Sequence, residues 1–175
     1  MIQEKNYTIN QKTYLLTNFT ALSRPDLLEI LHWRNNDQVR FNMNHSDIIS
    51  ETDHFAFVER LPQKKDKCYF QVSDKEKNKI GIIYFDKIGD NIAWLGIYSN
   101  PKSPIEKKGS LLMKTLLLTA YNDLSIRTLF LEVKTSNVGA IGLYHKFNFL
   151  ITEQNNEYII MKKDLTPDVF VDVSK

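Results

Sequence analysis

The stretch that decides the fold runs from Asn91 to Leu124 and reads NIAWLGIYSNPKSPIEKKGSLLMKTLLLTAYNDL. Its beginning is apolar and typical of a β-strand, its middle is rich in proline and lysine, and its end predicts a helix that is apolar almost all round. Such a loop presents the free N–H groups and the positive dipole of a helix N-terminus at the end of a strand. Because these groups bind anions, the stretch predicts a phosphate site.

Length and composition limit the fold and the function. With 175 residues and 42% hydrophobic content, the chain is long enough for one sizeable core. We expect a single domain over residues 1–175 with its core within 7–163, and we assign no structure to the tail 164–175. The net charge of +2 is too small to predict nucleic-acid binding, so Tyr69 and Tyr84 are interpreted as strand-packing residues rather than a base-stacking platform.

The same composition predicts a soluble cytoplasmic protein. The single cysteine cannot form an internal disulfide, the first residues do not resemble a signal peptide, and no apolar run is long enough to span a membrane. The four histidines lack the paired spacing with cysteine or carboxylate residues that a metal site needs, so we expect no metal.

The residues of the opening stretch resemble the acetyl-CoA-binding core of the GCN5-related N-acetyltransferases. In that family a strand, a pyrophosphate loop of the form (Gln/Arg)-x-x-Gly-x-(Gly/Ala) and a helix follow one another. Ending the motif at Gly109 places Pro104 at the Gln/Arg position and Lys107 at the first glycine. The next stretch, Thr128–Phe149 (TLFLEVKTSNVGAIGLYHKFNF), is similar to the family's next strand, its Asn-led helix and its Tyr before a Phe. The resemblance implies an acetyl-CoA-dependent N-acetyltransferase.

Hydrophobic periodicity and turn residues predict an α+β domain with a mostly antiparallel sheet of about seven strands and about four helices. The resemblance adds a splay between strands 91–99 and 128–134, which admits the pantetheine arm of acetyl-CoA. The expected elements, in chain order, are a hairpin or bent strand over Tyr7–Phe19, helices after Ser23 and Ser50, strands Lys67–Val72, Lys79–Lys87 and Asn91–Ser99, helix Gly109–Leu124, strand Thr128–Lys134, helix Asn137–Lys146, and strands Phe149–Gln154 and Glu157–Lys163.

The resemblance also assigns residues to the cofactor. The lysines of the loop, with Lys102 among them, lie where a pyrophosphate or ribose phosphate would bind, although loop lysines are often only solvated surface. The residues expected to hold acetyl-CoA are Ile97, Lys107, Lys108, Gly109, Ser110, Asn137 and Tyr144.

Acetyl transfer from a thioester to an amine needs a deprotonated amine, a donor for the oxyanion and a proton for the thiolate. Tyr144 is the expected proton donor, since it follows Asn137 by seven residues and can share its helix face; packing alone is the alternative. The resemblance implies a strand bulge near Ile97 or Tyr98 that frees a backbone N–H. The base is Glu132, His54 or a water chain, and Glu132 could instead simply face solvent.

Three short motifs bear on the acceptor: Leu31–Asn36 (LHWRNN), His54-Phe55-x-Phe57 and Leu95–Pro101 (LGIYSNP). They are similar to bacterial acetyltransferases that modify a UDP-linked 4-amino-4,6-dideoxy sugar in pseudaminic acid synthesis. The resemblance implies that the nucleotide or sugar is held by Arg34, His54, Lys87 and Tyr98. Arg34 suits a phosphate because a guanidinium forks onto two oxygens, but it could also be a cation favoured at a helix C-terminus.

Two other functions stay open on sequence grounds. Related acetyltransferases with a Trp-Arg-Asn segment act on protein N-termini, including ribosomal ones, and a non-catalytic binding module would tolerate the altered glycine motif. We therefore expect a small-molecule amine acceptor as the main partner, no nucleic acid and no membrane, with a homodimer as a further expectation.

Overall fold

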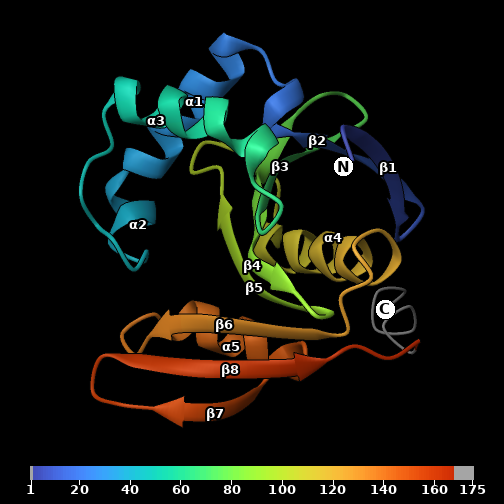
Figure 1. Ribbon diagram of the computed structural model, residues 1–175, viewed down its shortest axis with the longest axis vertical. Helices are drawn as coiled ribbons and strands as arrows, with labels where there is room; N and C mark the ends of the chain where they lie inside the picture. The colour runs from blue at the N-terminus through green and yellow to red at the C-terminus, as the bar shows by residue number, and fades with distance from the viewer. Residues whose placement is uncertain (1, 168–175) are drawn as a thin grey trace.

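The computed structural model describes residues 2–167 and contains one eight-stranded sheet in the order β1-β2-β3-β4-β5-β6-β8-β7 (Figure 1). The predicted α+β class with a mixed, mostly antiparallel sheet is confirmed, because β5 and β6 form the one parallel pair recorded in this sheet. Residues 168–175, most of the tail for which no structure was expected, lie outside the described part. The strands are β1 Glu4–Ile9, β2 Lys12–Asn18, β3 Cys68–Asp74, β4 Lys79–Gly89, β5 Ile92–Ser99, β6 Thr128–Lys134, β7 Leu150–Gln154 and β8 Tyr158–Asp164.

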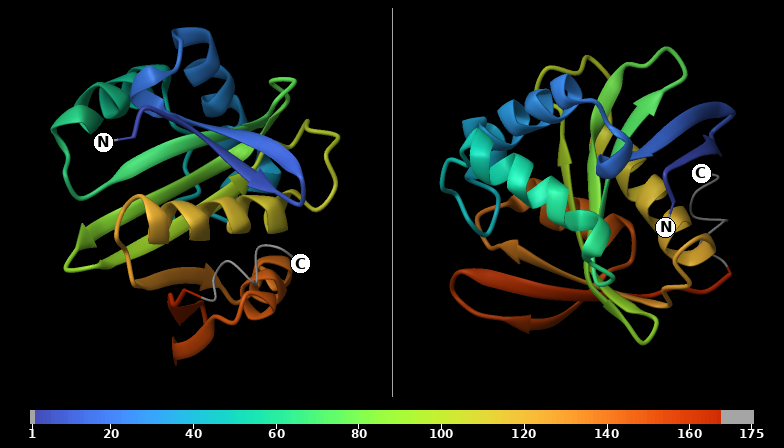
Figure 2. Two further views of the ribbon diagram at one scale, coloured as in Figure 1. Left: turned by 90° about the vertical axis from the view of Figure 1, so that its right-hand side faces the viewer. Right: turned by 45° about the horizontal axis from the view of Figure 1, so that its top comes forward.

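Helices cover both faces of the central strands. Figure 2 shows α1 and α3 on one side of β3, β4 and β5, and α4 on the other. The expected count of about four helices becomes five, because the polar segment after α1 contains the short helix α2. The helices are α1 Arg24–Asn35, α2 Asp37–Arg40, α3 Glu51–Arg60, α4 Lys108–Asn122 and α5 Val138–Lys146, and 3-10 turns η1 and η2 span Phe19–Ala21 and Leu61–Gln63. None of the helices in residues 2–167 is long and apolar enough to cross a membrane.

Local sequence explains where the helices begin. Ser23 caps α1 by accepting a hydrogen bond from the backbone N–H of Asp26, and Ser50 caps α3 by accepting from that of Asp53. Asn137 caps α5 in the same way, with its side chain accepting from the N–H of Ala140 at 3.2 Å. The start of α4 has no side-chain cap, which leaves its first N–H groups available to another acceptor.

Strand alternation divides the core into two layers. Ile83, Phe85 and their neighbours pack against α4, while Ile82 on the same strand packs against α1 and α3. Residues directly paired across β4 and β5 point to the same face, so Tyr84 and Gly96 lie on the α1/α3 face, as does Tyr98. Strands β4 and β5 therefore present one surface to α4 and another to α1 and α3.

The predicted splay between β5 and β6 is confirmed. The two strands pair only from Ile92 to Trp94, opposite Thr128 to Phe130, and then diverge, as Figure 1 shows. On its other side β5 stays paired with β4, and the N–H of Asn100 donates to the carbonyl of Ile80 at 2.9 Å.

That hydrogen bond sets the alternation along β5. Antiparallel partners alternate between residues that exchange backbone hydrogen bonds and residues that turn their N–H groups away. Since the register is unbroken from Gly81↔Ser99 to Asp86↔Trp94, the N–H groups of Ile97 and Ser99 point away from β4 and into the splay.

The prediction of a bulge near Ile97 or Tyr98 was wrong. The irregularity between β4 and β5 lies between Asp86 and Gly89, close to the turn. The physical reason is that the divergence of β6 already leaves the Ile97 N–H without a facing strand, so no extra residue is needed to free it.

Candidate active site

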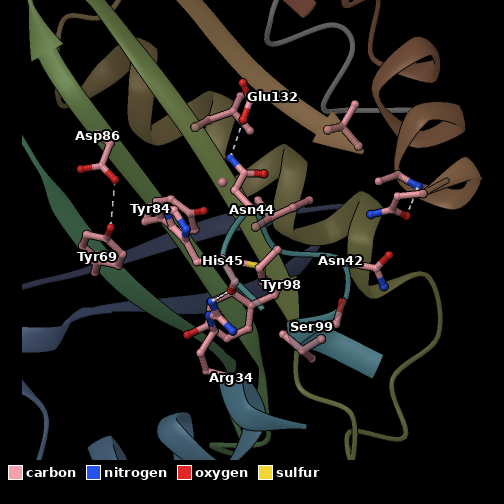
Figure 3. Close-up of a pocket in the computed structure, with 18 of the residues that line it drawn as sticks. Arg34, Asn42, Asn44, His45, Tyr69, Tyr84, Asp86, Tyr98, Ser99 and Glu132 are labelled. Atoms are coloured by element: carbon pink, nitrogen blue, oxygen red, sulfur yellow. Dashed lines mark hydrogen bonds between the residues drawn. The ribbon is translucent and has the colours of Figure 1, made fainter. Parts of the chain in front are cut away.

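A cavity of about 1040 Å³ follows the splay and reaches from α1 and α3 to the starts of α4 and α5 (Figure 3). Its lining includes most of the side chains that the sequence placed in a site: Arg34, His54, Lys87, Ile97, Tyr98, Lys108, Gly109, Glu132, Asn137 and Tyr144. Three of the expected cofactor lysines and hydroxyls, Lys102, Lys107 and Ser110, do not line it. The cavity thus brings the predicted acceptor and acetyl-CoA residues together in one space.

Tyr144 enters the cavity from α5, on the α4 side of the sheet. Its side chain is 6% exposed and meets the ring of Phe149 edge-on, with ring centroids 5.9 Å apart. Burial, with a smaller contribution from nearby Tyr84, raises the pKa of the Tyr144 phenol above its usual value. The phenol therefore packs against Phe149, lines the cavity and is protonated at neutral pH.

The loop before α4 keeps the geometry that glycine usually supplies. Lys107 has φ 54° and ψ 29°, the left-handed conformation that a glycine adopts without steric cost. A Cβ added to Gly109 would lie 3.1 Å from Cδ2 of Leu143, so the small residue lets α4 start close against α5. The motif has thus kept its backbone shape although its first glycine is a lysine.

Lys108 is engaged inside that loop. Its ammonium donates to the carbonyl oxygens of Asn100 and Ser103, each at 2.9 Å, and so fastens the end of β5 to the start of α4. The uncapped N–H groups of α4 and the free N–H groups of Ile97 and Ser99 match the pyrophosphate and pantetheine of acetyl-CoA. The residues present therefore fit this co-substrate.

On the α1/α3 face, two buried side-chain nitrogens of residues that line the cavity have no hydrogen-bond partner within residues 2–167. One is Nη1 of Arg34, whose Nη2 donates to the carbonyl of His45 at 2.6 Å. The other is Nε2 of His54, a side chain only 6% exposed. Because unpaired buried polar atoms are costly, they mark the place where a ligand would complete the site.

The protonation state of His54 follows from its surroundings. Burial lowers the pKa of its imidazole, and a hydrogen bond to the carbonyl of Leu27 opposes this only in part. Since Nε2 is the atom without a partner, Nδ1–H makes the bond to Leu27, and the neutral ring presents Nε2 as an acceptor. His54 is therefore suited to accept a hydrogen bond from a ligand.

Residues 41–49, which we call the strap, connect α2 to α3, line the cavity and contact β6, as Asn44 beside Glu132 shows (Figure 3). The side chain of Asn44 donates to Oε1 of Glu132 at 2.8 Å, and Nζ of Lys134 donates to the carbonyl of Phe41 at 2.8 Å. At the far end of the strap, the side chain of Asn35 bonds both the N–H and the carbonyl of Ile49. Glu132 is thus exposed, as its strand position allows, and is also joined to the strap.

Lys87 lies at the opposite end of the cavity. Its ammonium is 4.5 Å from the ring centroid of Trp94, which stacks on Phe130 with centroids 5.6 Å apart. The cation and the two stacked rings lie where β5 and β6 are still paired, and Lys87 and Trp94 line the cavity there.

The sequence interpretation missed the tyrosines of the cavity wall. Tyr69 and Tyr84 stack with centroids 4.8 Å apart and an interplanar angle of 7°, and both line the cavity. The hydroxyl of Tyr69 donates to Asp86 at 3.0 Å, and the ammonium of Lys67 lies 2.7 Å from the other oxygen of that carboxylate. Strand alternation would have placed these residues on one face, but it does not show which face meets the ligand.

The class of protein follows from this arrangement together with its likeness to known families. Residues 27–149 match the Acetyltransferase (GNAT) family, and the chain belongs to that family. It is an N-acetyltransferase, as the sequence predicted.

Individual relatives show which members of the family the chain resembles. The chain is 30% identical over 143 residues to Acetyltransferase PseH of Campylobacter jejuni subsp. jejuni serotype O:23/36 (strain 81-176), covering 82% of this chain and 88% of that protein. The crystal structure of C. jejuni N-acetyltransferase PseH in complex with acetyl coenzyme A is 27% identical, with a TM-score of 0.73 over 87% of this chain and 99% of that one. A spermidine N-acetyltransferase from Vibrio cholerae, solved with CoA and spermine, shares the fold at 20% identity and a TM-score of 0.76, over 86% of this chain and 95% of that one.

Among the described residues no group of three or more histidine, cysteine and acidic side chains is arranged to hold a metal ion.

Proposed function

We propose that this protein transfers the acetyl group of acetyl-CoA to the 4-amino group of a UDP-linked amino-dideoxy sugar, as a step of pseudaminic acid synthesis. The observation that carries the proposal is the pair of unpartnered buried atoms, Nη1 of Arg34 and Nε2 of His54, in the acceptor part of the cavity. The likeness to Acetyltransferase PseH supports acetyl transfer, and the motifs that resemble the pseudaminic acid enzymes support this acceptor.

The hydrogen-bonding roles of the two atoms, one acceptor and one donor, favour a nucleotide as the ligand. A uracil ring presents an N–H between two carbonyl oxygens, and a diphosphate presents further acceptor oxygens. His54 supplies an acceptor for the N–H, while Arg34 supplies a donor for an oxygen. A peptide N-terminus would place its own amine at the reaction centre but would bring no diphosphate to Arg34, so these two atoms favour the nucleotide over the runner-up acceptor.

In the proposed reaction, the acceptor amine and the departing thiolate contact residues on opposite faces of the sheet. The acceptor amine approaches from the α1/α3 face, where Tyr98 and Glu132 line the cavity, and Glu132 takes the proton of the amine through water. The N–H of Ile97 donates to the acetyl oxygen as negative charge develops on it. Tyr144 gives its proton to the departing thiolate from the α5 side.

The co-substrate residues complete the proposal. The start of α4, with Lys107, Gly109 and Ser110, holds the pyrophosphate, and Lys108 braces that loop from within. Asn137 keeps α5 in place by capping it, and so positions Tyr144. Lys87, whose ammonium lies over the ring of Trp94, supplies a positive charge at the far end of the acceptor part of the cavity.

The proposal also covers the domain organisation, the cellular location and the oligomeric state of the protein. We take residues 1–175 as one domain, because the sheet is continuous from β1 to β7, and we place the enzyme in the cytoplasm with its nucleotide substrates. A homodimer is part of the proposal, since the edge strand β7 exposes Leu150 at 71% and Ile151 at 44%. Light scattering on the purified chain tests the dimer.

Inhibition by UDP tests the acceptor class. UDP should compete with the amine acceptor and leave the KM for acetyl-CoA unchanged, because it would occupy Arg34 and His54 but not the splay. UMP and CDP serve as matched comparisons for the diphosphate and for the base. Absence of inhibition by millimolar UDP would exclude a UDP-linked acceptor. Calorimetry with acetyl-CoA tests the non-catalytic alternative, which predicts no binding at high micromolar concentration.

A further inference from the structure

We propose that the phenol hydroxyl of Tyr84 contacts the acceptor beside its reacting nitrogen, and that residue 96 is glycine in order to admit it. The inference rests on the acetyl transfer proposed above, and it assigns a role to two residues that the sequence analysis did not place among the site residues.

The position of the phenol is defined by Gly96. Tyr84 and Gly96 are direct partners across β4 and β5, and a Cβ added to Gly96 would lie 1.9 Å from Cζ and 2.1 Å from the hydroxyl oxygen of Tyr84. No side chain tolerates such contacts, so the end of the phenol lies directly over the Cα of Gly96. Since no glycine in residues 2–167 has a positive φ, space rather than backbone conformation requires glycine here.

This position is next to the reaction centre. Gly96 precedes Ile97, whose N–H points into the splay and is proposed to bind the acetyl oxygen. The phenol stands on the α1/α3 face, from which the amine approaches, whereas Tyr144 comes from the α5 side. Tyr84 also lines the cavity, between Arg34 and the splay (Figure 3).

The surrounding residues hold the ring rigidly. Tyr84 stacks in parallel on Tyr69, whose hydroxyl is bonded to Asp86, and Asp86 is paired with Lys67. A ring fixed in this way places its hydroxyl at one point, as a group that positions a substrate should.

The hydroxyl itself is unused by the protein. Within residues 2–167 no hydrogen bond is recorded for the Tyr84 oxygen, while the oxygen of Tyr69 is taken by Asp86. Burial raises the pKa of Tyr84 to about 12, so the phenol is neutral and can accept from an amine N–H or donate to a sugar oxygen. A phenylalanine would make the same stack, so packing alone does not account for the hydroxyl.

The Tyr84→Phe variant tests this role because it keeps the stack and removes one oxygen. We expect kcat/KM for the acceptor to fall by about tenfold or more, the KM for acetyl-CoA to stay within about twofold, and the Tm to be unchanged. Tyr14→Phe is the matched control, since it removes a phenol hydroxyl on β2 that does not line the cavity. Unchanged acceptor kinetics in Tyr84→Phe would overturn the inference.

A second variant checks the part played by Gly96. Gly96→Ala should lower both the Tm and the acceptor kcat/KM, because its Cβ displaces the ring. The double variant Gly96→Ala/Tyr84→Ala should have the same acceptor kcat/KM as Tyr84→Ala alone, because the ring that the added Cβ would displace is then absent. Wild-type kinetics in Gly96→Ala would show that the phenol is not held over residue 96, and would overturn the inference independently.

The kinetics are measured with whichever amine the wild-type enzyme acetylates. Failure of the proposed acceptor would appear as wild-type turnover of a different amine, whereas failure of this inference would appear as a Tyr84→Phe enzyme equal to wild type on that amine. A wild-type enzyme without turnover on any amine would overturn both.

Discussion

The side chain of Asn44 donates a 2.8 Å hydrogen bond to Oε1 of Glu132 and thereby joins the strap to β6, and both residues line the cavity. A second hydrogen bond, from Nζ of Lys134 to the carbonyl of Phe41, joins the strap to β6 two residues further along that strand. Glu132, the carboxylate proposed as the base, therefore also holds the strap. Separate variants are needed to distinguish the two roles.

Glu132→Gln and Asn44→Ala separate these roles. Glutamine keeps an oxygen that can accept from Asn44 but cannot take a proton, so we expect kcat to fall by about 10²-fold with a stable strap. Asn44→Ala keeps the carboxylate and should mainly raise the KM for the acceptor. If Glu132→Gln retained nearly full kcat, the base would be water or His54 instead.

Tyr144→Phe should lower kcat by about 10²-fold or more while acetyl-CoA binding, measured by calorimetry, stays unchanged. The phenol pKa is raised by burial, so the proton remains in place throughout the neutral and mildly alkaline range and no alkaline loss of kcat should arise from this group below its ordinary pKa of 10.0. Full turnover of the variant would exclude Tyr144 as the proton donor.

Arg34→Ala should raise the KM for the acceptor and leave the KM for acetyl-CoA unchanged, because Nη1 faces the acceptor space. Arg34→Lys is the matched control, since it keeps the charge and loses the fork, and we expect only partial recovery. An effect confined to acetyl-CoA would place Arg34 outside the acceptor site.

Lys107→Gly should stabilise the protein by about 1 kcal/mol, because glycine adopts the left-handed conformation without the clash of a Cβ. If the ammonium of Lys107 also attracts the pyrophosphate, the KM for acetyl-CoA should rise severalfold, more at low than at high salt. Thermal unfolding and a salt series of KM measure the two effects. A Tm below wild type would contradict the conformational explanation.

His54 should make stability depend on pH. The pKa of the buried imidazole is lowered from 6.5, so below that pH the unfolded chain binds a proton that the folded protein resists. The free energy of unfolding should therefore fall as the pH drops from 6.5 toward the lowered folded pKa, and be flat above. His54→Asn should lose this part of the slope in urea unfolding, and an unchanged slope would assign it to other groups.

Local patterns in the sequence predicted the elements that locate the site. The apolar helix α4 and the Asn-led helix α5 begin within a residue of their expected positions, and the strands on either side splay as the resemblance implied. The helix positions depend on hydrophobic periodicity and, for α5, on the Asn137 cap, which are read from neighbouring residues, whereas the splay was implied by the family resemblance.

The remaining features depend on contacts between distant residues. The bond from Asn44 to Glu132 spans 88 positions, and the placement of Tyr84 over Gly96 depends on the register between two strands. The direction of the Ile97 N–H follows from the same register, which explains why the bulge that the family resemblance implied there is not needed. Side-chain periodicity alone does not fix which residues face each other across strands.

The most direct test of the proposed function is a comparison of acceptors with purified protein and acetyl-CoA, with thiol release and product mass both measured. The acceptors are a UDP-linked 4-amino-4,6-dideoxy sugar, a peptide with a free N-terminus, and spermidine. We predict a singly acetylated nucleotide sugar and a kcat/KM at least about 10²-fold higher than for the other two. Preferred acetylation of the peptide or of spermidine would contradict the nucleotide-sugar assignment.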